Sequence, residues 1–558
     1  MGVEDRTISY GGRLMPEKTV VNIKKNILSS IVPGIIIGLF CALGYVVKYE
    51  HGLKFSASGL LLCAILCVVA AAVIALLFCL WDRRNNKLLL AVSKNDYLPN
   101  RVIKKSWLYF LAMVVVLLIL WLPALLAFYP GIYAYDASWQ YDMYRGGFVS
   151  EHHPVVHTYL VGWILDTVYT RTGMFNKAVL AYTIVQEFIM ALGCGFVFYE
   201  LHRRREPTWM HVLALLMFCA YPPFVIFVFS STKDSLFAIA VADFVFLSLG
   251  MAEDAKAFWG RRTNRVLWIV FALEIVALRN NSVYAVLLTL PFVIVSMAKS
   301  QGKGTRFKAF RSLIIATVIF LIYKYPITNA VTVEGVSKAE MLSVPCQQIM
   351  RVYTYHGDEI SREDKALVEQ LFDESKYHYY YNPCMADATK GSLTKAATNE
   401  EFGEFKSLWL KLFKEYPGEY VDSFLENTYG FWYPWPKYVL HSLGGEGYTP
   451  ILVMQPGEQN SKLPGLLEFY KQFEKSDVVM GNNWISWLFA PATFLYIAIV
   501  VGFYLLKTKK KSVAIPFVYL GLLWLTFLLG PVAMVRYALY LYALVPVWPA
   551  YIRSKAVK

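Results

Sequence analysis

Charged residues are scarce in this sequence of 558 residues. Only 17% are Asp, Glu, Lys or Arg, whereas 57% belong to the AVILMFWYC set, and the mean hydropathy is +0.43. Soluble chains carry about 25% charged and about 45–50% apolar residues. The apolar residues gather in runs of about 17–23, which are long enough to cross a hydrocarbon layer of about 30 Å. This composition excludes a soluble enzyme, a disordered scaffold and a small disulfide-rich secreted protein, and it predicts a polytopic membrane protein.

Cysteine pairs with metal-binding spacing are also missing. The sequence has eight cysteines, none of them in a CxxC arrangement, and six lie in apolar runs, where a buried thiol is ordinary. The other two, Cys346 and Cys384, fall in a long polar stretch. If that stretch lies outside the cytoplasm, the two can form a disulfide, and two free thiols are the alternative. No cleavable signal peptide is visible, so the first apolar run is expected to act as an uncleaved anchor.

Positive charge is present but unevenly placed. The formal net charge is +14, yet residues 329–484 contain 22 Asp and Glu against 14 Lys and Arg. The positive excess therefore lies elsewhere, in short clusters beside apolar runs, as is typical of cytoplasmic loops. This distribution indicates membrane orientation, and it gives no reason to expect a nucleic-acid partner.

The fold class predicted from these runs is an all-α polytopic membrane protein with about 12 transmembrane helices and a mixed, mainly helical extracytoplasmic domain. With both termini in the cytoplasm, every basic cluster falls on one side of the membrane. Residues 154–169 are apolar but short and contain His157 and Asp166, so we expect an interfacial or re-entrant helix on the outer side. The expected spans lie near residues 26–48, 58–80, 107–128, 178–200, 209–229, 235–252, 265–279, 282–298, 312–328, 485–506, 513–530 and 533–552.

Four regions follow from this threading. Residues 1–106 hold the cytoplasmic N-terminus and two extra transmembrane helices, and residues 107–328 form a transmembrane core whose first outer loop is 129–177. Residues 329–484 are long enough for a small extracytoplasmic domain. Residues 485–558 supply the C-terminal transmembrane helices.

The first outer loop carries the residues best suited to chemistry. Asp136 follows an apolar span and lies among tyrosines, which is a suitable position for a general base, and a cap on a short surface helix is the alternative. Asp142 follows six residues later. His153 and His157 are four residues apart, as zinc ligands often are, but neither HExxH nor a nearby cysteine accompanies them. Contacts to a phosphate or sugar, or ordinary interfacial histidines, are the other interpretations, and the metal question stays open.

Charged residues also fall at the expected outer ends of later spans. Lys233 and Asp234 are either a simple surface pair or part of a site completed by the first loop. Arg279 and Arg536 require a partner or a cavity unless they snorkel to the interface, and an anionic phosphate is one such partner. A few ionisable residues lie within the spans and keep a transporter interpretation open: Glu187, Asp243 and Glu274.

This pattern resembles the membrane glycosyltransferases of the GT-C superfamily, in particular the protein O-mannosyltransferase and lipid A aminoarabinose transferase branch. The similarity rests on the acidic residue of a long first outer loop, on His153 and Pro154 opening an apolar helix, and on later counterparts at Asp234, Arg536 and Tyr537. It covers the chain from about residue 107 to the C-terminus. The segments that look like an uncharacterised bacterial branch of that superfamily are 129–136, 231–235, 279–282, 342–348 and 426–433.

The resemblance implies an inverting glycosyltransferase of the hexosyltransferase or pentosyltransferase class in the plasma membrane, with its active site on the outer face. Its partners would be a polyprenyl-phosphate-linked sugar donor, a glycan, lipid or protein acceptor of the cell envelope, and the lipid bilayer. Asp136 would deprotonate the acceptor hydroxyl. The residues implied in substrate binding are His153, His157, Lys233, Asp234, Arg279, Arg536, Tyr537 and Asp142.

Two points of the resemblance depart from the usual pattern or stay open. His153 stands where relatives carry a lysine, and only one proline follows it. Some relatives bind a divalent metal through loop acids and others need none, so the sequence does not decide whether a metal cofactor is present. The alternatives to a glycosyltransferase are a solute or lipid transporter and a non-catalytic membrane protein with an outer sensing domain.

Overall fold

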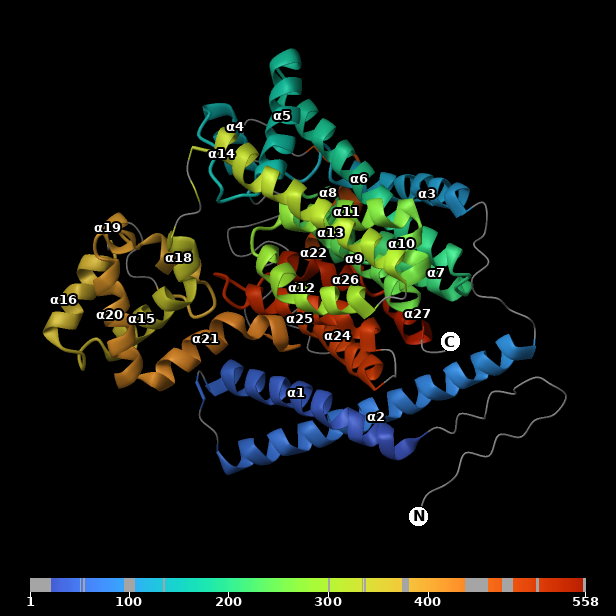
Figure 1. Cartoon of the computed structure of the whole chain (residues 1–558). Helices are drawn as coiled ribbons and strands as arrows, with labels where there is room; N and C mark the ends of the chain where they lie inside the picture. Colours follow the sequence, from blue (N-terminus) through green and yellow to red (C-terminus); the bar gives the residue numbers. More distant parts are fainter. Residues whose placement is uncertain are drawn as a thin grey trace.

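The computed structural model describes most of the chain as packed helices (Figure 1). The described residues are 22–50, 52–53, 56–94, 106–133, 136–299, 302–333, 335, 338–373, 381–436, 460–473, 485–507 and 511–554. Within these ranges the only β structure consists of isolated bridges. The predicted all-α class is therefore confirmed for the part of the chain that the structure describes.

Six helical segments are long and apolar enough to cross a membrane, or seven if one bent pair counts as a single span. The chain is thus a helical membrane protein, but the predicted number of 12 spans is not confirmed. The six segments are Ile23–Tyr49, Ala57–Asn86, Ser106–Ala127, Phe175–Arg203, Lys233–Glu253 and Lys303–Val331. Shorter apolar helices are Ser282–Ala298, Pro491–Leu506 and Ser512–Phe527.

Two expected spans are broken in the structure. The run at 209–229 forms α7, a π-helical turn and α8, with a bend of 57° before Pro222, which has no backbone N–H to continue a helix. The run at 533–552 forms two short helices, α26 and α27. Their bounds are α7 Thr208–Leu215, η1 Leu216–Ala220, α8 Pro222–Phe229, α26 Val535–Ala543 and α27 Trp548–Arg553.

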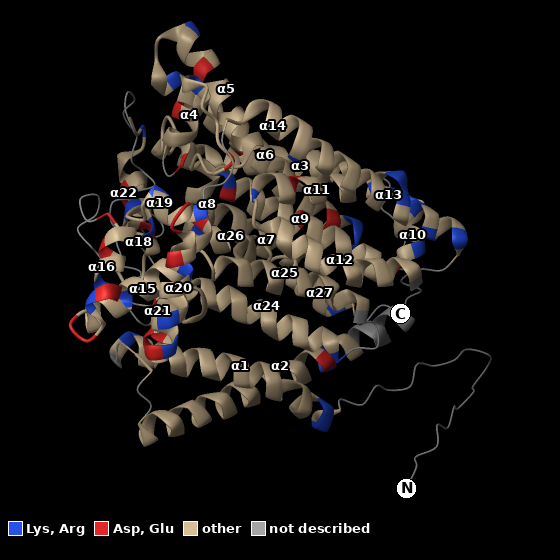
Figure 2. Cartoon of the chain, turned by 60° about the vertical axis from the view of Figure 1, so that its left-hand side comes forward, with Lys and Arg blue, Asp and Glu red and all other residues tan. Residues whose placement is uncertain are grey.

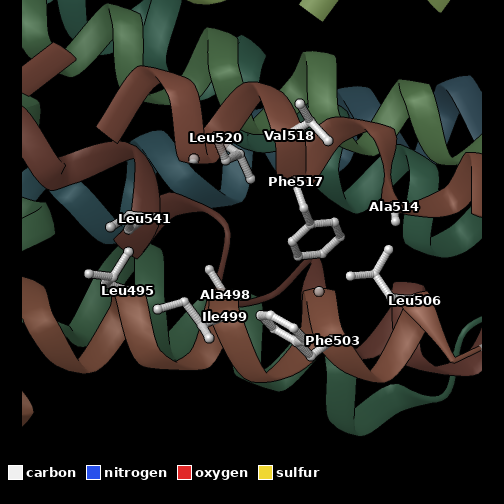
Figure 3. A pocket seen from close by; sticks show the side chains of 12 residues that line it. Leu495, Ala498, Ile499, Phe503, Leu506, Ala514, Phe517, Val518, Leu520 and Leu541 are labelled. Carbon is white, nitrogen blue, oxygen red and sulfur yellow. The ribbon is translucent and has the colours of Figure 1, made fainter. Parts of the chain in front are cut away.

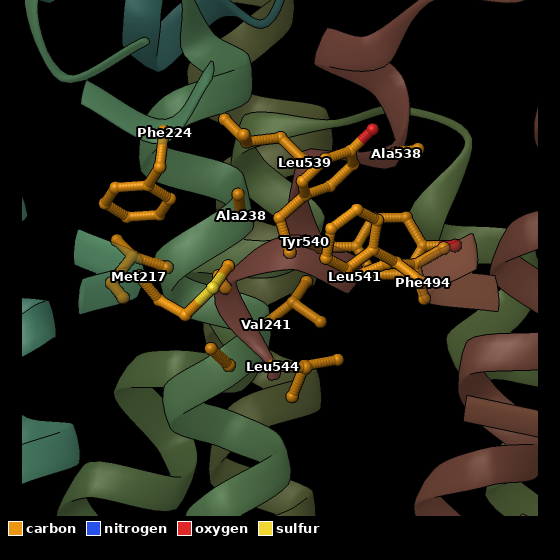
Figure 4. Packing of buried hydrophobic residues seen from close by; sticks show 14 of the residues in the cluster. Met217, Phe224, Ala238, Val241, Phe494, Ala538, Leu539, Tyr540, Leu541 and Leu544 are labelled. Atoms are coloured by element: carbon orange, nitrogen blue, oxygen red, sulfur yellow. The ribbon is translucent and has the colours of Figure 1, made fainter. Parts of the chain in front are cut away.

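The central bundle surrounds α9 (Lys233–Glu253). In the most apolar 18-residue segment of this helix, 83% of the residues are buried. Figure 4 shows Ala238 and Val241 of this helix packed against Leu539 and Leu544 of the α26 region, with Met217 on the opposite side. The other helices of the core are α3 Ser106–Ala127, α6 Phe175–Arg203, α10 Ala255–Gly260, α11 Arg262–Leu278, α12 Ser282–Lys299, α13 Lys303–Ile322, α24 Pro491–Leu506 and α25 Ile515–Phe527.

A helical hairpin at the N-terminus lies against one side of this bundle (Figure 1). Its two helices are α1 (Ile23–Glu50) and α2 (Ala57–Lys94). Gly34 and Gly38 of α1 lie so close to Ala71 and Cys67 of α2 that a Cβ at either glycine would come within 2.5 Å of its neighbour. Small residues permit this close approach of two helices in lipid.

Two groups of helices stand apart from the bundle at one end of it (Figure 1). The first outer loop folds into α4 (Ala137–Gly146) and α5 (Val155–Thr172), so the helix expected at 154–169 is present. The expected extracytoplasmic domain has its own apolar core, formed around Ile349, Phe405 and Leu408. Its helices are α15 Ser343–His356, α16 Arg362–Leu371, α18 Ala386–Gly391, α19 Lys395–Thr398, α20 Phe402–Glu415 and α21 Pro417–Trp432. The remaining elements are η2 Tyr323–Ile327, α14 Thr328–Val331, η3 Lys338–Leu342, α22 Pro464–Gln472, η4 Ser486–Leu488 and η5 Lys511–Ala514.

The two cysteines of the polar stretch do not pair. No disulfide joins Cys346 and Cys384 in the structure, so the predicted pairing is not found there. The reason is their placement: Cys346 is buried in the core of the outer domain, whereas Cys384 packs against the core of the membrane bundle.

Candidate active site

The loop after α3 is held against the turn between α8 and α9 by a short parallel bridge between Ile132 and Ser230. The Ile132 backbone N–H donates to the Phe229 carbonyl at 3.0 Å, and the Ser231 N–H donates to the Ile132 carbonyl at 2.9 Å. Because Asp136 follows the first segment and Lys233 follows the second, this bridge brings the two side chains together.

Asp136 occupies the N-cap position of α4, but its side chain makes no capping hydrogen bond. Its Oδ2 instead accepts a hydrogen bond from Lys233 Nζ and lies 3.3 Å from Arg536 Nη1. Asp136 therefore stands at the cap position of the helix, but its carboxylate does not cap the helix and instead belongs to a cluster of ion pairs. This cluster, called the ion cluster below, consists of Asp136, Lys233, Asp234, Arg279 and Arg536.

Asp234 lies in the first turn of α9, where the helix dipole favours a negative charge. Its side chain is fully buried, and the Thr232 hydroxyl donates to Oδ2 at 3.0 Å. Arg279 donates to Oδ1 through Nε at 2.8 Å and also through Nη2. Arg536 Nε lies 3.7 Å from Oδ2. Asp234 therefore joins the two arginines from the buried side.

Arg279 follows α11 and reaches the cluster between aromatic rings. Its guanidinium carbon lies 4.5 Å from the ring centre of Tyr537 and 4.7 Å from that of Phe527. These two rings are parallel, with centres 5.9 Å apart. Arg279 thus does not snorkel to an interface: its partner is Asp234, and aromatic rings add a favourable cation–π contact. Tyr537 shapes this part of the site, and its hydroxyl accepts from Arg536 Nη2 at 3.3 Å.

The ion cluster has three cationic side chains against two carboxylates, and four of its five members are largely buried. Burial by itself raises the pKa of Asp136, but the charges of Lys233 and Arg536 outweigh it and hold this pKa well below its ordinary value. The cluster therefore keeps a net positive charge at neutral pH. Such a site favours an anionic ligand.

His153 and His157 have different roles in the structure. His153 precedes α5, and its Nδ1 lies 3.8 Å from Asp136 Oδ2. Burial and the nearby Lys233 charge lower the pKa of His153 to about 2, so it is neutral at physiological pH and adds no cation to the cluster. His157 lies inside α5 and is hydrogen-bonded to Gln140 at 3.0 Å and Tyr182 at 2.9 Å. Its ring therefore supports the packing of α4 and α5 on α6.

Asp142, like His157, is an expected site residue that does not join the ion cluster. It lies on the exposed face of α4 and has no hydrogen bond or ion pair to the ion cluster. The expectation that Asp142 binds substrate is therefore not supported by its position, because the turn of α4 directs it away from the buried face that carries Gln140 and Tyr141.

Sequence reasoning missed Gln186, which is buried in α6. Its Nε2 donates to the carbonyls of Val228 at 2.8 Å and Ser230 at 2.6 Å, so it fixes the turn that leads to Lys233. The sequence did contain an indication of this role: Gln186 is an amide inside an otherwise apolar span, where a polar group needs a hydrogen-bonding partner.

The outer domain also borders the site, which the sequence did not predict. Ala386 N–H donates to the Pro531 carbonyl at 2.7 Å, and Asn427 Nδ2 donates to the Gly530 carbonyl at 3.1 Å. These contacts hold the loop that leads into α26, only a few residues before Arg536.

The residues of the cluster do not fit a divalent metal. In the part of the chain that the structure describes, no three His, Cys, Asp or Glu side chains are grouped so that they could hold a metal ion. The two nearest carboxylates, Asp136 and Asp234, are occupied by cationic side chains. A metal cation at this place would be repelled, since three cationic side chains already exceed the two carboxylates.

An apolar pocket lies between α24, α25 and α26 (Figure 3), with a volume of about 230 Å³. Ile499, Phe503 and Phe517 face into it, and its lining contains no charged side chain. Leu541 on α26 closes one side. Arg536 stands on the same helix five residues earlier, which corresponds to a rise of about 7.5 Å along the axis.

The fold and the site together define a helical membrane protein with a buried, net-positive ion cluster at one end of its central bundle. Residues 142–552 match the DUF6020 family, a family of unknown function, and the chain belongs to that family. No curated protein and no solved structure matches the chain. The match includes His153, Lys233, Asp234, Arg279 and Arg536 and begins six residues after Asp136.

Proposed function

We propose that this chain is a glycosyltransferase that uses a lipid-phosphate-linked sugar and acts at the outer face of the plasma membrane. The observation that carries the proposal is the ion cluster: a half-buried carboxylate adjoins two cations at the end of a membrane bundle. A general base and a phosphate-binding group are the two components that such a transfer needs. The resemblance to the GT-C superfamily supports the same assignment.

The proposed step is a single displacement at the anomeric carbon. The acceptor hydroxyl attacks this carbon, its proton passes to Asp136, and a new glycosidic bond forms. The bond between the anomeric carbon and the phosphate oxygen breaks, and the phosphate leaves with the electron pair. Lys233 and Arg536 would stabilise the negative charge that develops on the leaving phosphate, because fixed cations in a site of low dielectric act strongly.

The apolar pocket supports a donor that carries a hydrocarbon chain. It lies within the bundle beside α26, the helix that also bears Arg536. In this proposal the phosphate lies at the ion cluster and the chain extends along α26 toward the pocket. The acceptor would then enter from the side of the outer domain, whose helix α18 contacts the loop before α26 through Ala386 and Pro531.

A transporter is the second candidate, and one residue favours it. Asp243 is buried in the middle of α9, and its Oδ1 has no hydrogen-bond partner among the described residues. A carboxyl group inside a membrane bundle is costly and often functional. Asp243 and Asp136 therefore separate the two functions experimentally.

The test is complementation in a strain that lacks the gene, with the glycan composition of the cell envelope as the readout. Wild type and Asp243→Asn should restore the missing glycan, whereas Asp136→Asn should lower the transfer rate by about 10²–10⁴-fold, the usual contribution of a general base. All three proteins must be present in the membrane at equal levels. Full restoration by Asp136→Asn would overturn the assignment of the base, and loss of function only in Asp243→Asn would favour transport.

A further inference from the structure

One oxygen of Asp136 forms ion pairs with both Lys233 and Arg536 on the more exposed side of the ion cluster. Oδ2 accepts from Lys233 Nζ, and it lies 3.3 Å from Arg536 Nη1 and 3.8 Å from His153 Nδ1. The side chain of Asp136 is 21% exposed, whereas those of Lys233 and Arg536 are 12% and 5% exposed. The carboxylate therefore covers the two cations from the side at which solvent enters.

The second carboxylate of the cluster lies on the opposite side. Asp234 has no exposed surface and is fixed by Arg279 and by the Thr232 hydroxyl. An incoming anion therefore cannot replace Asp234 without unpacking the bundle. It can replace Asp136, because only this carboxylate is reached from outside.

We propose that Asp136 is an internal competitor for the phosphate site, and that a bound phosphate displaces its carboxylate from Lys233 and Arg536. The displaced carboxylate then becomes available as a base. This regulation of the site rests on the proposed function as far as the base is concerned, whereas the exchange of one anion for another stands on the geometry alone.

The exchange is favourable for electrostatic reasons. Inorganic phosphate is largely a dianion at neutral pH and carries more charge than a carboxylate. The phosphate of a lipid-linked sugar is a diester with one negative charge, but its two free oxygens can accept two parallel hydrogen bonds from an arginine. Once Lys233 and Arg536 turn to the phosphate, Asp136 loses the cations that hold its carboxylate in the ionised form and regains proton affinity. The lipid-linked donor would therefore bind before the acceptor, because the base is engaged until the phosphate arrives.

Isothermal titration calorimetry with inorganic phosphate, on the full chain in detergent, tests the competition. Asp136→Asn removes the internal anion, so it should bind phosphate about tenfold more tightly than wild type, or better. Asp142→Asn is the matched control: it makes the same change of net charge six residues away, on α4 and outside the cluster, and its affinity should stay within about twofold. Adding Lys233→Met to Asp136→Asn should abolish the gain.

The outcomes are distinct. Unchanged or weaker phosphate binding by Asp136→Asn overturns the proposal, and so does an equal gain in Asp142→Asn, because the effect would then be one of net charge. Asp136→Ala has the same expected result and serves if the asparagine variant does not fold, since the side chain makes no cap bond to α4.

The result is also independent of sugar transfer. Tighter phosphate binding by Asp136→Asn together with an unaltered envelope glycan in the deletion strain would keep the competition and remove the glycosyltransferase. Loss of the glycan in Asp136→Asn together with unchanged phosphate binding would keep the glycosyltransferase and remove the competition.

Discussion

The buried imidazole of His157 makes the stability of the protein depend on pH. It is hydrogen-bonded to Gln140 and Tyr182, and burial, followed by the charge of Lys233, lowers the pKa of His157 to about 3. In the unfolded chain a histidine titrates near about 6.5. Between these two values the unfolded state binds a proton that the folded state does not, so stability falls as the pH falls from about 6.5 toward 3.

His157→Gln should therefore flatten this pH dependence. Glutamine keeps hydrogen-bonding groups for Gln140 and Tyr182 but does not titrate. Between pH 7 and pH 5 the free energy of unfolding of the wild type should fall by about 2 kcal/mol through His157, and that of the variant should not. Thermal unfolding midpoints of both proteins at several pH values measure the difference. His356→Gln is a control of opposite sign, because hydrogen bonding to Glu359 raises the pKa of His356. Equal slopes for wild type and His157→Gln would contradict the assignment.

At the scale of residues, the sequence predicted the members of the site better than their pairing. Position at the outer end of a span was enough to single out Asp136, Lys233, Asp234, Arg279 and Arg536. It could not show that Asp136 meets Arg536, which is 400 residues away in the chain, or that Arg279 is already held by Asp234. The expected disulfide failed for a related reason, since a shared polar stretch does not imply a shared core.

At the scale of elements, the N-terminal hairpin depends on buried polar contacts with the bundle. Asp82 of α2 accepts hydrogen bonds from Asn26 at 2.9 Å, from Tyr504 at 3.0 Å and from Lys507 at 3.1 Å. At the other end of the hairpin, Leu53 N–H donates to Asp422 Oδ1 of α21 at 2.8 Å. The hairpin precedes the residues that match the family, and it is nevertheless fixed to them at both ends.

Lys507→Met should loosen this attachment. The Lys507 side chain is 3% exposed, and the substitution removes its buried ammonium group from the largely buried carboxylate of Asp82, which costs about 3 kcal/mol. The measurement is the thermal unfolding midpoint followed by tryptophan fluorescence, and Lys308→Met, on the exposed face of α13, is the matched control. A midpoint equal to that of the control would mean that the ion pair does not hold the hairpin.

Hydropathy located the helices but not their breaks. Each expected span coincides with a helix or with a pair of helices. The sequence did not predict the bend before Pro222 or the division of the last span into α26 and α27. A run of apolar residues indicates that a segment lies in the membrane, but it does not show where the helix axis bends or breaks. The break also matters for the site: Arg536 stands in the first turn of α26 and reaches Asp136 because that helix begins there.

At the scale of the whole molecule, Figure 2 shows most charged residues toward the ends of the bundle and in the outer domain, with a few near α8, α9 and α11. At the end opposite the ion cluster, Arg204 pairs with Glu253 at 2.7 Å, and Arg553 of α27 pairs with Glu206 at 2.6 Å. The ion cluster and the outer domain lie at the other end. That the site and the basic clusters face opposite sides of a membrane stays a prediction, which rests on the positions of the basic clusters in the sequence.

Labelling with a membrane-impermeant thiol reagent tests that prediction in intact cells. Asp358→Cys lies in the outer domain and Arg171→Cys at the end of α5, and both positions are exposed and should react. Arg262→Cys, at the start of α11, is equally exposed but should react only after the membrane is made permeable, because its basic cluster is expected on the cytoplasmic side.

Arg171 is the decisive position. The α5 segment has 18 residues, so its length alone would allow it to cross. Protection of the Arg171→Cys variant would then move Lys233 and Arg536, which both follow α5, to the cytoplasmic side and separate them from Asp136. Reaction at Arg171→Cys together with protection at Arg262→Cys keeps the site in one compartment, where a lipid-linked donor and an envelope acceptor can both reach it.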